Sequence, residues 1–210
     1  MENLIDKKKN LTEKEAFTLA LQHHQKNNLK VAENLYREIL KINPNHANAH
    51  NNLGIVLEQL GESKKAMICF QKAVQINPNF ARAHYNLGKV FYALNEIQKA
   101  INCFEKAIKY KSENLNYYFN LSNLKKEIID LDLKNMITEI ISKNSTSKKN
   151  IAYGNYLLAM YERKIKNYEQ EINFLIKGHL NYFESKKDKY KKEINYWFNV
   201  LPKIKNFSKK

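Results

Sequence analysis

The chain has 210 residues, 43% hydrophobic and 27% charged, a length and composition that suit one compact domain or one short solenoid. Its N-terminus lacks the apolar run of a signal peptide, and nowhere do about 18 apolar residues follow one another, so the sequence predicts a cytoplasmic protein without a membrane span. The net charge of +15 includes nine Lys against Asp188 and Glu193 in residues 186–210, a run more typical of a solvated tail than of a nucleic-acid site.

A period of 34 residues organises the first half of the chain. Residues 1–11 are polar without periodicity and are expected to form a flexible tail, whereas repeats are predicted at 12–45, 46–79 and 80–113. The pairs that recur one period apart are Leu53 and Leu87, Gly54 and Gly88, Ala66 and Ala100, Phe70 and Phe104, Ala73 and Ala107, and Pro44 and Pro78.

Within each repeat, apolar residues at helical spacing predict two amphipathic helices joined by a turn. Asn95 stands in that turn one period after Gly61, and Asn tolerates the left-handed backbone that a turn glycine adopts. Gly54 lacks bulk, so the helices of a pair are expected to approach closely there, and Phe70 is expected to fill the gap to the following repeat. Thr12 followed by Glu15 predicts a capping box at the first helix.

The order Leu-Gly, Ala, Phe, Ala and Pro at this period resembles the tetratricopeptide repeat. The resemblance implies an all-α fold, a right-handed α-solenoid (superhelix) of antiparallel helix pairs. It is strong over residues 12–113 and weaker afterwards. It also implies a non-catalytic, monomeric scaffold that binds an extended peptide or protein partner in the concave groove lined by the first helix of each pair.

Residues 114–185 are predicted to form degenerate helix pairs of the same type. Asn120, Leu121 and Ser122 follow Asn86, Leu87 and Gly88 by one period, which predicts a fourth first helix, with residues 132–143 as its partner. A fifth pair is expected from residues 151–164 and 168–183, with a turn near Asn167.

The basic stretch 186–210 is predicted to hold a capping amphipathic helix and a tail. Its apolar stripe comprises Tyr190, Ile194, Trp197, Phe198 and Leu201. Residues 150–202 resemble the segment that links such repeats to a sulfotransferase domain in some bacterial proteins. The alternative function is therefore the non-catalytic portion of a split or truncated sulfotransferase-type or glycosyltransferase-associated enzyme, with the stripe as a possible docking surface for a catalytic domain.

The candidate groove residues lie on the predicted first helices. Asn52, Asn86 and Asn120 recur one period apart, so their amides could form a column that holds a peptide backbone, like the asparagine ladder of O-linked N-acetylglucosamine transferases, or could bond locally. The neighbouring candidates are Asn51, Arg82, Tyr85, Lys89, Phe119 and Asn123. A carboxylate clamp, in which Lys, Asn and Arg side chains of such repeats hold the terminal carboxylate of a peptide, fits less well. Asn86 stands where the clamp needs an Arg, and Leu21 stands where it needs an Asn.

No catalytic, metal or cofactor site is predicted. His46 and His50 have a spacing that can bind a metal, but no Cys, Asp or Glu completes a set, and packing at the groove edge is favoured since His50 recurs as His84. Phosphate loops and hydrolase motifs are absent from the sequence. Cys69 and Cys103 occupy the same site in adjacent repeats and are interpreted as small buried hydrophobic residues.

Overall fold

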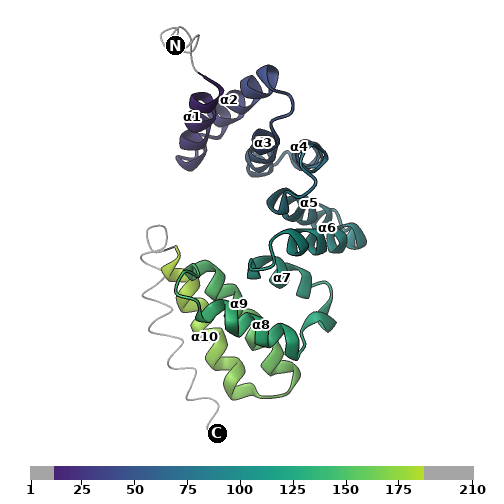
Figure 1. Cartoon of the computed structure of the whole chain (residues 1–210), viewed down its shortest axis with the longest axis vertical. Coiled ribbons are helices and arrows are strands. Elements are labelled where there is room, and N and C mark those ends of the chain that lie inside the picture. Colours follow the sequence, from purple (N-terminus) through teal and green to yellow (C-terminus); the bar gives the residue numbers. More distant parts are fainter. Residues whose placement is uncertain (1–11, 187–210) are drawn as a thin grey trace. The chain divides into compact units, whose positions relative to one another are not determined.

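The computed structural model describes residues 12–186, which fall into two compact units, 12–110 and 111–186. The first unit consists of three helix pairs (Figure 1). These are α1 (Glu13–Gln25) with α2 (Leu29–Ile42), α3 (Ala47–Gln59) with α4 (Ser63–Ile76), and α5 (Ala81–Ala93) with α6 (Ile97–Tyr110). Helix α2 also contacts α3, and α4 contacts α5; no strand occurs between residues 12 and 186. The predicted all-α solenoid is confirmed.

In the second and third pairs, the two helices meet where a glycine faces a phenylalanine. A Cβ atom on Gly54 would lie 2.6 Å from the ring of Phe70, and one on Gly88 would lie 2.7 Å from the ring of Phe104. Both rings are buried, as is Ala66. Phe70 therefore packs on the glycine of its own pair, and the absence of a side chain at Gly54 sets the distance between the two helices.

Local sequence determines where the helices begin and turn. The predicted capping box is present: the Thr12 hydroxyl accepts from the Glu15 backbone N–H, and the Glu15 carboxylate accepts from the Thr12 backbone N–H at 2.9 Å. The turn within each pair of the first unit contains one residue at positive φ, namely Asn27, Gly61 or Asn95. The prediction that Asn95 replaces the turn glycine is confirmed by its φ of 60°.

One histidine on α3 and one on α5 tie these first helices to the proline that follows the preceding pair. His50 Nε2 lies 2.9 Å from the Pro44 carbonyl oxygen, and His84 Nε2 lies 2.7 Å from that of Pro78. Since a carbonyl oxygen only accepts, Nε2 carries the proton in both rings. His46 instead caps α3, accepting from the Ala49 N–H at 3.2 Å. The recurrence of histidine thus has a structural cause.

The His84 contact should make the stability of the first unit depend on pH. Burial lowers the pKa of His84 below its ordinary value of 6.5, Pro78 acts in the opposite direction, and Lys106 lowers it further. The neutral form is favoured in the folded state, so this contribution is complete above about pH 6.5 and falls as the pH drops toward the lowered pKa. As the pH falls from 7.5 to 5.5, the free energy of unfolding measured in urea should decrease less for His84→Gln than for the unchanged chain. Equal decreases would contradict the role assigned to His84.

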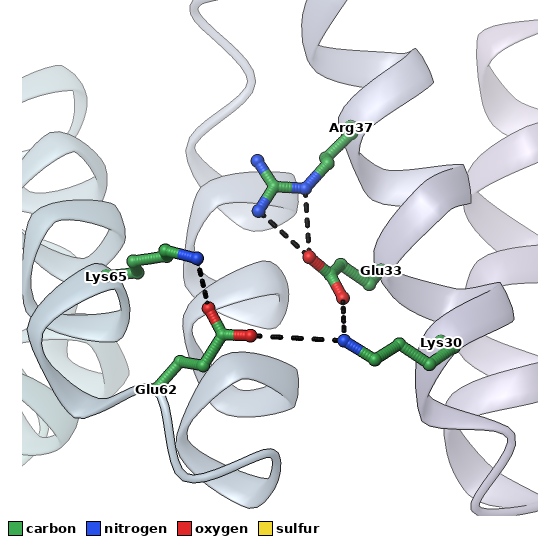
Figure 2. Close-up of polar contacts among 5 residues, drawn as sticks. All are labelled: Lys30, Glu33, Arg37, Glu62 and Lys65. Carbon is green, nitrogen blue, oxygen red and sulfur yellow. Dashed lines mark hydrogen bonds and ion pairs between the residues drawn. The ribbon is translucent and has the colours of Figure 1, made fainter.

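An ion network joins the second helices α2 and α4 (Figure 2). Glu33 pairs with Arg37 at 2.9 Å and with Lys30 at 3.3 Å, and Lys30 also lies 3.9 Å from Glu62, which pairs with Lys65. Burial alone would raise the pKa of Glu33, but the hydrogen bonds and charges of Arg37 and Lys30 hold it below its ordinary value. Each carboxylate has a cation, but only the exposed Lys30–Glu62 pair crosses between the repeats, so we expect it to contribute about 0 to 1 kcal/mol.

The second unit is built around a long central helix. Its elements are α7 (Leu115–Ser122), the 3₁₀ turn η3 (Lys126–Ile128), α8 (Leu131–Ser142), α9 (Lys148–Lys164) and α10 (Tyr168–Glu184). Helix α9 contacts α7, α8 and α10. Its Leu157 and Leu158 join the core formed by Leu115, Ile137 and their neighbours. The fourth first helix thus spans only eight residues, and both it and α8 pack on α9.

Asn150 fixes the start of α9 beside the start of α7. Its Oδ1 accepts from the Leu115 N–H at 2.8 Å, and its Nδ2 donates to the Glu113 carbonyl at 2.8 Å.

None of the helices between residues 12 and 186 combines the length and the apolar character that a membrane-spanning helix needs.

Candidate functional site

The candidate site is the surface formed by the first helices α1, α3 and α5, called the first-helix face below. Side chains join neighbouring first helices along it. His24 Nε2 lies 3.0 Å from Gln59 Oε1, between α1 and α3, and Lys89 Nζ lies 2.9 Å from Glu58 Oε1, between α5 and α3. These contacts hold the first helices in a fixed arrangement.

Three of the predicted groove residues form a chain of amide hydrogen bonds. Asn86 Nδ2 donates to Asn51 Oδ1 at 2.9 Å, and Asn51 Nδ2 donates to Asn52 Oδ1 at 3.1 Å. The three side chains are 6%, 1% and 8% exposed, respectively. Such a buried amide chain fixes the register between α3 and α5, because each lost bond would leave a buried polar atom unpaired.

Helix α5, which carries Asn86 of this amide chain, also presents an accessible stripe of side chains. Arg82, Tyr85, Lys89 and Tyr92 are spaced at i, i+3, i+7 and i+10, which places them along one side of the helix. Arg82 is exposed and has no ion-pair partner among residues 12–186, whereas Tyr85 packs beside Phe104 with ring centroids 5.8 Å apart. Tyr92 is 54% exposed. The stripe combines two cations with two aromatic rings.

The other predicted site residues belong to the second unit. Phe119 packs against Tyr153 and Tyr156, with centroids 5.4 and 5.8 Å apart. Asn120 Nδ2 donates to the Asn116 carbonyl at 2.8 Å, and Asn123 is the exposed C-cap residue of α7. The predicted column of Asn52, Asn86 and Asn120 stays a prediction, because its members lie in different units.

Several features of the candidate site were missed by the sequence analysis. Tyr92 lies one turn after Lys89 on the same side of α5, and helical spacing from Arg82 would have identified it. Glu58 pairs with Lys89 across the repeat boundary, a contact that a period of 34 residues alone does not reveal.

The apolar stripe predicted at Tyr190, Ile194, Trp197, Phe198 and Leu201 lies outside the described residues.

The described part of the chain contains no group of three or more His, Cys, Asp or Glu side chains placed to hold a metal ion. The thiols of Cys69 and Cys103 are free, and burial raises the pKa of each to about 11. A thiol with so high a pKa is a poor nucleophile at neutral pH, because the thiolate is the reactive form.

Family models match the region that carries the first-helix face. One described as TPR repeat matches residues 59–95, and two described as tetratricopeptide repeat match residues 35–67 and 81–114. Together these matches cover residues 35–114, and they support the predicted resemblance to tetratricopeptide repeats over that stretch. A search of curated proteins finds no match.

Solved structures share the fold at low sequence identity. Two structures of MamA align over 81% and 85% of this chain and 97% and 94% of their own, with TM-scores of 0.56 and 0.54 and identities of 20% and 21%. The first TPR of Spaghetti (RPAP3), bound to the HSP90 peptide SRMEEVD, aligns over 55% of this chain and 91% of its own, with a TM-score of 0.51 and 15% identity. At these identities the likeness concerns the fold alone.

Proposed function

We propose that this chain is a protein-interaction scaffold that binds an extended peptide segment along the first-helix face of residues 12–110. The observation that carries the proposal is the accessible stripe of Arg82, Tyr85, Lys89 and Tyr92, next to the amide chain. A peptide-bound structure among the fold neighbours supports peptide binding as a use of this architecture.

The chemistry of the stripe favours a segment that carries both an aromatic or apolar residue and an acidic one. Tyr92 offers an exposed ring on which an apolar side chain can pack, and aromatic residues contribute strongly to such interfaces. Arg82 has no ion-pair partner among residues 12–186, and its guanidinium can donate two parallel hydrogen bonds to a carboxylate. Lys89 already pairs with Glu58, so Arg82 is the stronger candidate for an acidic group.

The test is selection of a peptide from a phage-displayed library on the full chain, followed by affinity measurement with charge-reversal variants. Arg82→Glu should weaken binding about 10-fold or more, corresponding to about 1.4 kcal/mol. Lys72→Glu is the matched control, because Lys72 is an exposed lysine on the second helix α4. Equal affinity of both variants would place binding elsewhere and contradict the proposal.

The sulfotransferase-type alternative stays a prediction from the sequence. It would be supported by a sulfotransferase-like reading frame directly downstream in the DNA, and its test is co-purification of that product with this chain. A scaffold for an extended peptide requires no such neighbour.

A further inference from the structure

Two accessible side chains of different chemistry mark the ends of helix α5. Arg82, the second residue of the helix, is exposed and has no ion-pair partner among residues 12–186. Tyr92, the last residue but one, is 54% exposed. Its ring offers a surface on which an apolar group can pack, whereas Arg82 offers a cation with a fork of hydrogen-bond donors. The accessible stripe thus has a charged end and an aromatic end.

The two stripe residues between these ends are already engaged within the chain. Lys89 Nζ lies 2.9 Å from Glu58 Oε1 on α3, so its charge is balanced, and Glu58 would repel an acidic side chain placed beside it. Tyr85 is half-buried and packs beside Phe104. Of the four stripe residues, Arg82 therefore selects the charge of a ligand.

Helical geometry fixes the distance between the two ends of the stripe. Tyr92 follows Arg82 by ten positions in one uninterrupted helix, and at about 1.5 Å per residue their Cα atoms lie about 15 Å apart along its axis. Side chains of a helix lean toward its N-terminus, so both tips are displaced in the same direction. An extended peptide advances about 3.3 Å per residue, so four residues span about 13 Å and six span about 20 Å.

The alternation of side chains in an extended peptide restricts the spacing further. Successive side chains point to opposite sides, and only residues an even number of positions apart face the same surface. A spacing of three or five residues would turn one of the two ligand side chains away from α5. Among the even spacings, four matches the distance along α5 better than two or six.

We propose that the first-helix face recognises an extended segment in which a side-chain carboxylate and an apolar side chain stand four residues apart, the carboxylate on Arg82 and the apolar side chain on Tyr92. This inference rests on the proposed function and adds the spacing that the ligand must have. Both contacts come from one helix, which is a rigid element, so the separation of the two groups determines the fit.

A spacing series made from the phage-selected peptide tests this inference. The peptide is synthesised with an amidated C-terminus, so that side chains supply its only carboxylates. A photoreactive phenylalanine at position 92 of the full chain identifies the apolar residue of the peptide that lies there. One acidic residue is then placed two to six positions from that apolar residue, and every other acidic residue is replaced by its amide. Binding should be tightest at a spacing of four and about 10-fold weaker at two, the loss of one anchoring contact.

Variants at the two ends of α5 show whether the spacing preference comes from this helix. At a spacing of four, Arg82→Gln and Tyr92→Ala should each lower affinity about 10-fold. At a spacing of two, only one of these variants should still weaken binding, because the peptide reaches one end of the stripe at a time. Lys72→Gln, at an exposed lysine of α4, is the matched control and should leave affinity unchanged at every spacing.

The outcomes distinguish this inference from the proposed function. Affinity that does not vary with spacing, or that is highest at a spacing other than four, would overturn the spacing rule. If Arg82→Glu still weakened binding in that case, the proposed function would stand. Equal affinity of the Arg82→Glu and Lys72→Glu variants would overturn both.

Discussion

Replacement of Gly54 by Val is expected to lower the free energy of unfolding of the first unit by about 3 kcal/mol, because the new side chain meets an aromatic ring. A Cβ atom at this position would lie 2.6 Å from Phe70 Cε1, 2.8 Å from Cδ1 and 2.9 Å from Cζ. The ring is buried on the neighbouring helix α4 and has no free space into which it can turn. Urea unfolding followed by circular dichroism measures the loss.

A double variant identifies the cause of that loss. Phe70→Ala alone should cost about 3 to 5 kcal/mol through the cavity it leaves, but combined with Gly54→Val it should cost less than the sum, because the valine fills part of that cavity. Ile68→Ala is the control on the same helix: its side chain is 56% exposed, and its effect should stay within about 0.5 kcal/mol. Additive losses would show that Gly54 and Phe70 do not share this contact.

Replacement of Lys134 by Met is expected to lower the free energy of unfolding of the second unit by about 2 to 4 kcal/mol, since a buried carboxylate loses its cation. Glu162 is 3% exposed, and its Oε1 accepts from Lys134 Nζ at 2.9 Å. After the change, Asn167 Nδ2, 2.9 Å from Oε2, would be the one remaining partner of that carboxylate within residues 12–186. The lysine also lies over the Tyr161 ring, 4.5 Å from its centroid.

The control is Lys41→Met, which removes a similar contact from the surface. The side chains of Lys41 and Glu38 are 70% and 63% exposed, so water replaces the lost partner and the expected cost is about 0 to 1 kcal/mol. A loss at Lys134 no greater than that at Lys41 would contradict the structural role assigned to Glu162.

The first three helix pairs were predictable because local and periodic features agree there. The spacing of Gly54 with Phe70 repeats one period later, Thr12 and Glu15 form the predicted capping box, and Asn95 adopts the positive φ expected of it. Each feature depends on residues close in sequence or on one fixed period, which a single sequence contains.

The arrangement of the second unit was harder to predict because it depends on contacts that follow no period. Helix α9 has 17 residues, against eight in α7, and it supports three neighbours. Its Gly154 approaches Ile141 and Leu115, which belong to two different helices. No repeat spacing specifies such a junction.

The bonding of the candidate site residues also could not be predicted. The sequence placed Asn52 and Asn86 one period apart, which is equally consistent with binding a peptide and with local bonding. Asn51, between them in the amide chain, has the least exposed side chain of the three, and the 35-residue separation of its bond to Asn86 departs from the period. Only the relative placement of α3 and α5 determines that pairing.

The claim that the first-helix face binds a peptide is tested most directly by photo-crosslinking at two positions of matched exposure. A photoreactive phenylalanine replaces Tyr92 on α5, which is 54% exposed, or Ile68 on α4, which is 56% exposed. With the phage-selected peptide added to the full chain, we expect a crosslinked product from position 92 and none from position 68. Crosslinking from position 68 alone would place the peptide on the second-helix side and contradict the account.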